Sequence, residues 1–283
     1  MNINFTKMHG IGNDYVYVDG FKYTINDPNK FSEFVSDRHF GIGSDGLILI
    51  LPSDVADFRM RMFNADGSEG KMCGNATRCI GKFVYEAGYT KSDKVTLETL
   101  SGIKYLTLHV ENEKVVSVDV DMGMAILKPA DIPMTAGGDT FINQPITIDD
   151  TIYHGTAVSM GNPHVILYCD DVDSINLETI GPKFEFNPLF PERVNTEFVQ
   201  IINENTVKMR VWERGSGETW ACGTGACAVA VSCVLNGYCK KGEEITVILR
   251  GGELKITYNE DGTVLMQGPA TKVFDGTIEY KED

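Results

Sequence analysis

Two stretches decide the fold: residues 58–89, FRMRMFNADGSEGKMCGNATRCIGKFVYEAGY, and residues 207–238, VKMRVWERGSGETWACGTGACAVAVSCVLNGY. They align without a gap at a constant offset of 149 residues. An ungapped register over this much chain, with a period of about half its length, indicates the duplication of a whole domain. The register matches Gly12-Asn13 with Gly161-Asn162, Met60 with Met209, Arg61 with Arg210, Glu69 with Glu218, Cys73 with Cys222 and Gly88-Tyr89 with Gly237-Tyr238.

Each half predicts strands on both sides of one helix. Helical spacing covers residues 75–86 in the first half and continues from Cys222 to Leu235 in the second. Residues 181–192 contain three prolines and predict an irregular stretch, and residues 273–280 predict a last strand without a counterpart. The sequence therefore predicts an α+β fold of two pseudo-symmetric domains, each a mostly antiparallel sheet around a central helix.

Length and charge limit the classes of function. The 283 residues suffice for two domains, and a net charge of −15 argues against nucleic acid or an anionic membrane as a partner. We see neither a signal peptide nor an apolar stretch long enough to span a bilayer, and we expect a soluble protein. The seven cysteines include no CxxC pair, which disfavours a disulfide framework or a zinc site and favours reduced thiols in the cytoplasm.

Each half places a cysteine directly before its helix, Cys73 and Cys222. The first turn of a helix exposes unpaired N–H groups and a partial positive charge, and both favour a thiolate. We therefore expect each thiol to have a pKa below the free value of about 8.5. The N–H groups of Gly74-Asn75 and Gly223-Thr224 also offer an anion site.

Two opposed thiols suit the inversion of a carbon acid. If the domains face each other about a pseudo-twofold axis, a carboxylate held between the helix starts has its α-carbon between the sulfurs. One thiolate then removes the α-proton, and the opposite thiol delivers a proton to the other face. No cofactor signature is evident, so we expect chemistry without metal or cofactor. The remaining cysteines are expected to be inert core residues: Cys79, Cys169, Cys227, Cys233 and Cys239.

Further polar residues lie near these cysteines in the alignment. Glu213-Arg214 occupies the loop approaching Cys222, where the first half has Asn64-Ala65, and duplicated domains acquire specificity where they differ. An arginine can bind a carboxylate bidentately, and a glutamate can bind an ammonium group or orient a thiol. His164 and His9 are each either a supporting group or a structural histidine. The remaining candidates are the turn amides Asn13, Asn64, Asn162 and Asn195 and the aligned pair Glu69 and Glu218, for which loop stabilisation is an equal explanation.

At these residues the sequence closely resembles the diaminopimelate epimerase family. The resemblance covers essentially the whole chain and runs through both halves in the family's order. The segments that carry it are MHGIGNDYV at 8–16, FNADGSEGKMCGNATRC at 63–79, SMGNPHV at 159–165, RVNTEFV at 193–199 and ERGSGETWACGTGACA at 213–228.

The resemblance implies a cofactor-independent interconversion of LL- and meso-diaminopimelate for lysine and peptidoglycan synthesis. It implies Cys73 and Cys222 as acid/base thiols, supported by His164 and Glu213. The expected partner is the small-molecule substrate diaminopimelate, and the expected assembly is a homodimer. The resemblance also implies a first domain of residues 1–122 plus 268–283, completed by the last strand, and a second of residues 123–267. The implied substrate contacts are Asn13, Asn64, Gly74, Asn75, Asn162, Asn195, Glu213, Arg214, Gly223 and Thr224.

Several alternatives stay open. Proline and hydroxyproline racemases share the two-cysteine chemistry, but they usually carry a histidine where this chain has Asn75 and lack the Glu-Arg pair. Phenazine-biosynthesis-type isomerases are not built on two opposed cysteines. A binding protein for a small amino acid would need neither thiol, and a disulfide-switched sensor would use both. Some family members also carry Gln where this chain has Gly46.

Overall fold

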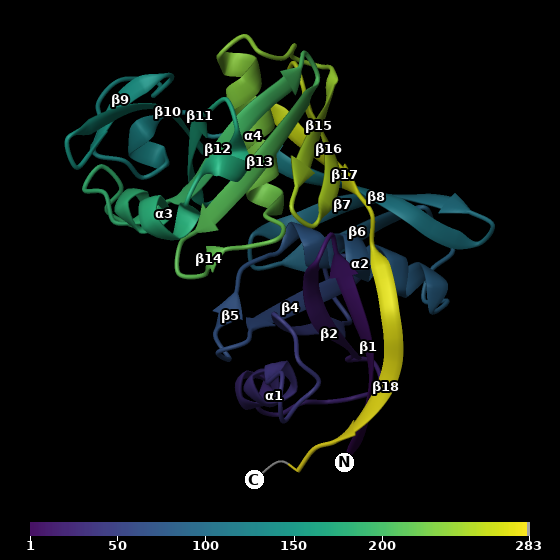
Figure 1. Cartoon of the computed structure of the whole chain (residues 1–283). Coiled ribbons are helices and arrows are strands. Elements are labelled where there is room, and N and C mark those ends of the chain that lie inside the picture. The colour runs from purple at the N-terminus through teal and green to yellow at the C-terminus, as the bar shows by residue number, and fades with distance from the viewer. Residues whose placement is uncertain (282–283) are drawn as a thin grey trace. The chain divides into compact units, whose positions relative to one another are not determined.

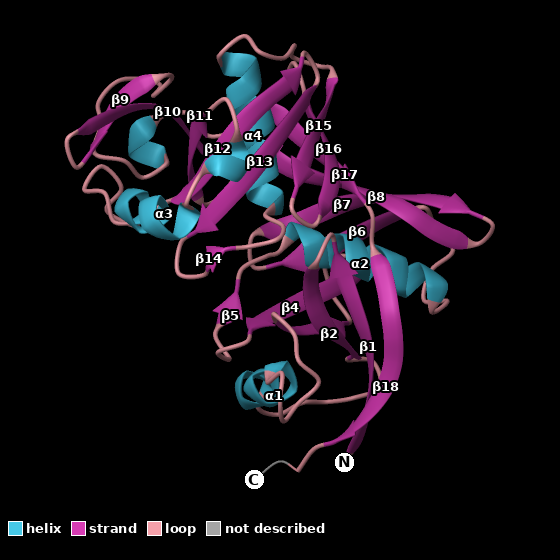
Figure 2. Cartoon of the chain, viewed as in Figure 1, coloured by secondary structure: helices cyan, strands magenta, loops and turns pink. Residues whose placement is uncertain are grey.

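The computed structural model describes residues 1–281, which form two compact units (Figure 1). Unit 1 contains Met1–Val120 and the chain from Gly268 on, and unit 2 contains Asp121–Gln267. The predicted first domain includes residues 282 and 283, which lie outside the described residues. Strands make up most of the regular structure in both units (Figure 2). Within residues 1–281, no helix is long and apolar enough to cross a membrane.

Unit 1 is a mostly antiparallel sheet. The neighbours β2–β3 and β4–β6 run parallel, and the other pairs of neighbouring strands run antiparallel. In sheet order the strands are β18 (Thr271–Glu279), β1 (Asn2–Gly10), β2 (Asn13–Asp19), β3 (Gly46–Leu51), β4 (Phe58–Asn64), β6 (Lys94–Thr99), β7 (Gly102–Glu111) and β8 (Lys114–Met124), with β5 (Glu69–Gly70) paired to β4. The helices are α1 (Pro28–Ser36) and α2 (Gly74–Glu86).

Unit 2 has the same construction. The neighbours β11–β12 and β13–β15 run parallel, and the other pairs run antiparallel. In sheet order the strands are β9 (Gln144–Ile148), β10 (Thr151–Ser159), β11 (Pro163–Tyr168), β12 (Asn195–Asn203), β13 (Thr206–Glu213), β15 (Glu244–Leu249), β16 (Gly252–Tyr258) and β17 (Thr263–Gly268), with β14 (Gly217–Glu218) paired to β13. The helices are α3 (Leu177–Glu185), α4 (Gly223–Leu235) and the 3-10 turns η1 (Pro129–Asp131) and η2 (Val172–Ser174).

The two strand orders match step by step, including both parallel junctions, which confirms the predicted duplication. The prediction that the last strand has no counterpart is wrong. β18 pairs antiparallel with β1, and β9 pairs antiparallel with the equivalent strand β10. Sequence alignment misses this correspondence because the two strands occupy different places in the chain. β9 comes directly before its partner β10, whereas β18 is the last strand of the chain and its partner β1 is the first.

A central helix packs against each sheet, as predicted. α4 contacts β10, β11, β12, β15 and β16, and ten of its residues from Gly223 to Cys233 are buried. Its small side chains, mostly alanine, valine and cysteine, let the strands surround it closely. α2 contacts β1 and β7 and is buried along its first two turns. Each helix therefore begins deep inside its own unit.

The predicted irregular stretch is partly wrong, because α3 occupies its beginning. Asn176 caps the helix by accepting a hydrogen bond from the Thr179 N–H, and Pro182 lies inside it. Leu177 and Phe184 lie on one face and are almost fully buried in the core of unit 2. This burial outweighs the unfavourable helix propensity of proline.

We predict that Phe184→Ala lowers the free energy of unfolding by about 3–5 kcal/mol, because it leaves a cavity in this core. Phe186, two residues further on, is 64% exposed. Phe186→Ala is the matched control and should change the free energy of unfolding by less than about 1 kcal/mol. Urea denaturation of the three proteins measures both values, and equal effects of the two substitutions would contradict this packing.

Candidate active site

In unit 1, a hydrogen-bonded cluster forms around the start of α2. Cys73 is the N-cap residue, and its Sγ lies 3.3 Å from Asn13 Oδ1. Asn75 Nδ2 donates to the same oxygen at 3.2 Å. Asn13 follows a tight turn in which Ile11 and Gly12 have positive φ, and this turn brings β2 back along β1. The structure thus groups three predicted residues, Cys73, Asn75 and Asn13.

Asp45 holds the Asn13 side chain on the side away from Cys73, and the sequence analysis missed this residue. Its Oδ2 accepts from Asn13 Nδ2 at 2.9 Å and from the Asp14 N–H at 3.1 Å, and its Oδ1 accepts from Arg38 at 3.1 Å. Burial and the nearby Asp14 carboxylate raise the pKa of Asp45. The amide of Asn13 is therefore held with its oxygen toward Cys73.

Arg78 is a second residue that the sequence analysis missed. It is fully buried on α2, one turn after the N-terminus of the helix. Its guanidinium donates to Asn75 Oδ1 at 2.8 Å, to the Gly74 carbonyl at 3.3 Å and to the Pro269 carbonyl at 3.1 Å. A buried charge of this kind needs such partners, and here they include two predicted substrate contacts.

Other predicted residues of unit 1 lie outside this cluster. Asn64 is exposed at the end of β4, and its Nδ2 donates to Ser68 Oγ at 2.9 Å. His9 accepts from the Gly12 N–H through Nδ1 at 3.2 Å, which supports a role in the turn. Glu69 forms a bidentate ion pair with Arg61, and in unit 2 Glu218 forms the same pair with Arg210. These pairs brace equivalent loops.

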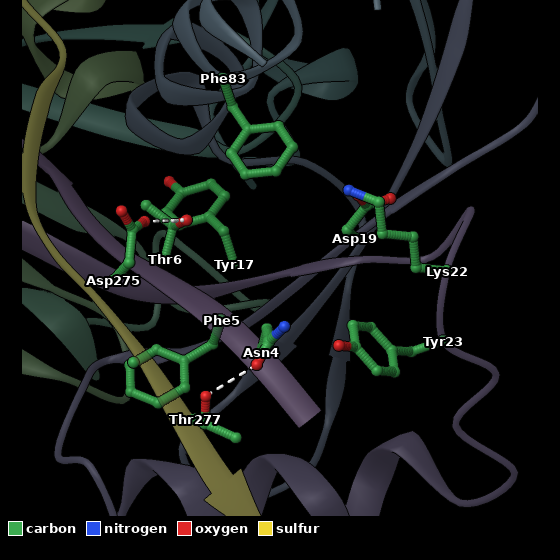
Figure 3. Close-up of a pocket in the computed structure, with 11 residues that line it drawn as sticks. Asn4, Phe5, Thr6, Tyr17, Asp19, Lys22, Tyr23, Phe83, Asp275 and Thr277 are labelled. Atoms are coloured by element: carbon green, nitrogen blue, oxygen red, sulfur yellow. Dashed lines mark hydrogen bonds and ion pairs between the residues drawn. The ribbon is translucent and has the colours of Figure 1, made fainter. Parts of the chain in front are cut away.

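Unit 1 also contains a cavity of about 440 Å³ between β1, β2, β18 and α2 (Figure 3). Its polar side chains bind one another: Thr6 donates to Asp275 at 2.8 Å, and Thr277 donates to Asn4 at 2.7 Å. Among the described residues that line this cavity, none is a predicted site residue. The cluster at Cys73 is therefore distinct from it.

In unit 2, an equivalent cluster forms around the start of α4. Cys222 is the N-cap residue, and its Sγ accepts from the Gly225 N–H at 3.3 Å and lies 3.6 Å from Thr224 Oγ1. Asn162 Nδ2 donates to Thr224 Oγ1 at 3.3 Å. Asn162 thus approaches the first turn of α4 as Asn13 approaches that of α2, in keeping with their shared position in the repeat.

The end of β13 and the loop that follows it bring Glu213 and Arg214 to this cluster. Glu213 interacts with Cys222 and accepts a hydrogen bond from Thr219 Oγ1, and burial raises its pKa. Arg214 donates through its side chain to the Glu192 carbonyl at 2.9 Å. Its backbone N–H donates to Asn195 Oδ1 at 2.9 Å, and Asn195 Nδ2 donates to the Pro163 carbonyl at 3.1 Å. Asn195 therefore joins the loop to the start of β11.

His164 is fully buried between two polar partners. Its Nδ1 lies 2.6 Å from Glu197 Oε1, and its Nε2 lies 3.1 Å from Asn162 Oδ1. Glu197 on β12 is also fully buried and was missed by the sequence analysis. The signal for it was a charged residue inside an apolar strand, since glutamate is almost never fully buried without a partner.

The pKa values of both cysteine thiols are raised, whereas the sequence predicted that they would be lowered. Burial raises the pKa of Cys73, although the N–H groups of Ala76 and Asn75 oppose this shift. Burial also raises the pKa of Cys222 well above its ordinary value, and the carboxylates of Glu213 and Glu197 add to the shift. The prediction of lowered pKa values is wrong because desolvation of the thiolate outweighs the stabilisation by the helix N-terminus.

Comparisons with known proteins identify the family. A family model for diaminopimelate epimerase matches residues 5–128 and 156–273. A diaminopimelate epimerase from Methanococcus maripaludis is 59% identical over 278 residues, covering 98% of this chain and 100% of that protein. The chain belongs to the diaminopimelate epimerase family. Membership in this family of isomerases confirms the resemblance found in the sequence.

Solved structures support the fold assignment. A phenazine biosynthesis protein of the PhzF family from Bacillus anthracis has a TM-score of 0.74 at 18% identity and covers 99% of this chain and 100% of its own. A hydroxyproline epimerase from Agrobacterium vitis has a TM-score of 0.72 at 13% identity and covers 98% of this chain and 91% of its own. At these identities the likeness concerns the fold alone, and it confirms the predicted two-domain fold of the epimerase family.

The raised pKa values predict slow alkylation of both cysteines near neutral pH. Because only the thiolate reacts, the rate of reaction with iodoacetamide should rise with pH through an inflection above the value for N-acetylcysteine. The inflection for Cys222 should lie above that for Cys73, since its carboxylate neighbours add to the effect of burial. Mass spectrometry of each peptide measures the two rates, and inflections below pH 8 would contradict these pKa directions.

Proposed function

We propose that this chain interconverts LL- and meso-diaminopimelate, with Cys73 and Cys222 as the two acid/base groups. The observation that carries the proposal is the equivalent N-cap position of the two cysteines in the two units of a diaminopimelate epimerase family member. A single structural cysteine could occur at such a position by chance. Two cysteines at equivalent positions, each with an equivalent asparagine nearby, indicate a shared chemical task.

The proposed reaction breaks one C–H bond and forms another on the opposite face. One cysteine thiolate takes the α-proton and becomes a thiol, while the other thiol gives its proton to the carbanion and becomes a thiolate. A buried thiolate with a raised pKa is a stronger base than a free one, which assists removal of a weakly acidic α-proton. The protonation states of the two cysteines are exchanged after each turnover and must be reset before the next.

The helix starts supply a site for the carboxylate at the reacting centre. The N–H groups of Gly74, Asn75, Gly223 and Thr224 lie in the first turns of α2 and α4, where anions bind favourably. As charge moves onto the carboxylate in the transition state, these groups stabilise it. The amides of Asn13 and Asn162 complete the proposed contacts at this end of the substrate.

The second amino-acid group of diaminopimelate needs its own recognition. We assign this role to Asn64, Asn195, Glu213 and Arg214, with Arg214 binding the distal carboxylate and Glu213 also supporting Cys222. Proline has no second amino-acid group, so a proline racemase would have nothing for these four polar side chains to bind. The hydroxyproline epimerase among the solved structures shares only the fold at 13% identity and does not favour that substrate here.

The surroundings of the enzyme follow from the same proposal. All seven cysteines are free thiols, and a reaction that needs two of them reduced fits the cytoplasm. The proposed partner is the small-molecule substrate, in lysine and peptidoglycan precursor synthesis, with no nucleic acid or membrane. A homodimer stays a prediction from the resemblance.

Replacing either cysteine should abolish epimerisation. Cys73→Ala and Cys222→Ala each remove one proton-transfer group, and we expect kcat/KM for LL-diaminopimelate to fall by about 10³-fold or more. Cys169→Ala is the matched control, because Cys169 is a partly buried thiol that donates to the Val199 carbonyl at 3.6 Å and belongs to neither cluster. Proton NMR of the reduced proteins with LL-diaminopimelate, and separately with L-proline, measures the rates.

Each alternative function has its own outcome in this experiment. Inversion of L-proline but not diaminopimelate would keep the two-thiol chemistry and overturn the substrate. Inversion of neither substrate by reduced protein would overturn the enzymatic proposal and favour a binding protein. Activity retained in one of the two cysteine variants would contradict the paired role of the thiols.

A further inference from the structure

Glu197 is a buried carboxylate that none of the roles above explains. It lies on β12 beside β11, opposite Ile166, and both it and His164 are fully shielded from solvent. Its Oε1 bonds His164, whereas its Oε2 has no hydrogen-bond partner among residues 1–281. A buried carboxylate with one unpaired oxygen lowers the stability of the fold, so we expect Glu197 to have a functional role.

A continuous chain of contacts leads from Glu197 to Cys222. It runs from Glu197 to His164 at 2.6 Å, from His164 to Asn162 at 3.1 Å, and from Asn162 to Thr224 at 3.3 Å. Thr224 Oγ1 lies 3.6 Å from Cys222 Sγ. Every member belongs to unit 2, and the chain ends at a proposed acid/base thiol.

The hydrogen-bond roles along this chain have one consistent direction. Asn162 directs its Nδ2 to Thr224, so its Oδ1 faces His164 Nε2 and requires that nitrogen to carry a proton. His164 can then be an imidazolium facing the Glu197 carboxylate, or a neutral ring that accepts a proton from a carboxylic acid at Nδ1. In both cases one proton lies between Glu197 Oε1 and His164 Nδ1.

The direction of these hydrogen bonds determines whether the Thr224 hydroxyl can donate to Cys222. Since Thr224 Oγ1 accepts from Asn162, its own hydroxyl hydrogen is free to point at the sulfur of Cys222. If the Asn162 amide were reversed, the Thr224 hydroxyl would donate to the amide oxygen instead. A donor at the sulfur stabilises the thiolate, which this buried position otherwise disfavours.

We propose that Glu197 is a positioning residue, which acts through His164 and Asn162 to direct the Thr224 hydroxyl onto the Cys222 thiolate. This inference rests on the proposed function, because it assumes that Cys222 exchanges protons with substrate. The close packing at the helix start agrees with it. A Cβ on Gly225 would lie 2.6 Å from Glu197 Oε1 and 3.1 Å from Cys222 Sγ, so any larger residue at this position would press on both groups.

Glu197→Leu tests this role, because it removes the anchor of His164 without adding a polar group. We expect kcat for LL-diaminopimelate to fall about tenfold to a hundredfold, as is typical when a group that orients a functional residue is removed. KM should change less than about threefold, because the direct contacts proposed for the substrate remain. Glu197→Gln retains a hydrogen bond to His164 Nδ1 and should keep kcat within about threefold of the parent value.

Thr196→Val is the matched control for Glu197→Leu. Thr196 is the neighbouring residue on β12, is fully buried, and has a hydroxyl without a hydrogen-bond partner in the described part of the chain. Its replacement also removes a buried polar group, but Thr196 is not part of the chain of contacts to Cys222. We expect kcat of this variant to equal that of the parent.

A double-mutant cycle separates positioning from general structural damage. Thr224→Val removes the hydroxyl through which Glu197 is proposed to act on Cys222. In that background, Glu197→Leu should therefore lower kcat less than about twofold. The alkylation rate of Cys222 gives a second reading of the same cycle that needs no substrate. The Glu197 carboxylate also acts directly on the pKa of Cys222 in both backgrounds, so only the part of its effect that depends on Thr224 reports positioning. Failure of the parent to turn over diaminopimelate would therefore sink the proposed function while leaving this inference open to test.

Three results would overturn the inference. The first is an equal effect of Glu197→Leu on kcat with and without Thr224, and the second is parental kcat in Glu197→Leu. The third needs no variant at Glu197: ¹⁵N NMR of the parent protein, with His164 assigned by His164→Gln, should show a proton on Nε2. A neutral ring protonated only on Nδ1 would reverse the chain of hydrogen bonds and contradict the proposed direction.

Discussion

Each of the two thiols lies at the first turn of a helix, Cys73 partly buried and Cys222 buried, and this position controls its pKa. A thiolate there gains from the helix N–H groups but loses more from the absence of water, and the loss dominates for both Cys73 and Cys222. The thiols are therefore held mainly protonated until something compensates the buried charge. In the proposed reaction, polar groups arranged around each sulfur provide that compensation.

The fold creates this position by enclosing each helix start. The sheet of each unit surrounds a helix that is buried from its N-terminus, and the small residues of α4 allow strands to approach on several sides. Asparagines at equivalent positions of the repeat then reach the first turn of each helix. Duplication thus provided two similar clusters from one architecture.

The two clusters differ in the charged residues around the cysteine. In unit 1 the buried charge near Cys73 is the cation Arg78, and Asp45 holds the asparagine. In unit 2 the groups near Cys222 are Glu213, Glu197 and His164. Divergence of this kind fits a reacting carbon whose two faces are not equivalent, and it gives the two thiols different electrostatic surroundings.

Much of this arrangement could be predicted from the sequence, because the repeat shows which residues occupy equivalent positions in the two units. The ungapped register located both helix-start cysteines, Asn13 and Asn162. The pKa directions could not be predicted, since desolvation depends on the packing of distant strands. Asp45, Arg78 and Glu197 were missed because their roles arise from contacts across the sheet, and the helix α3 was missed because burial of Phe184 outweighs Pro182.

In the proposed reaction two different groups, Cys73 and Cys222, move the proton on and off the α-carbon. Initial-rate epimerisation of LL-diaminopimelate in D₂O, followed by mass spectrometry and proton NMR, distinguishes two groups from one. With two groups, the first product formed carries solvent deuterium at the inverted carbon while recovered substrate keeps its proton. Product that retains the original proton, or substrate that exchanges without inversion, would show that a single group serves both faces and that the two-thiol mechanism is wrong.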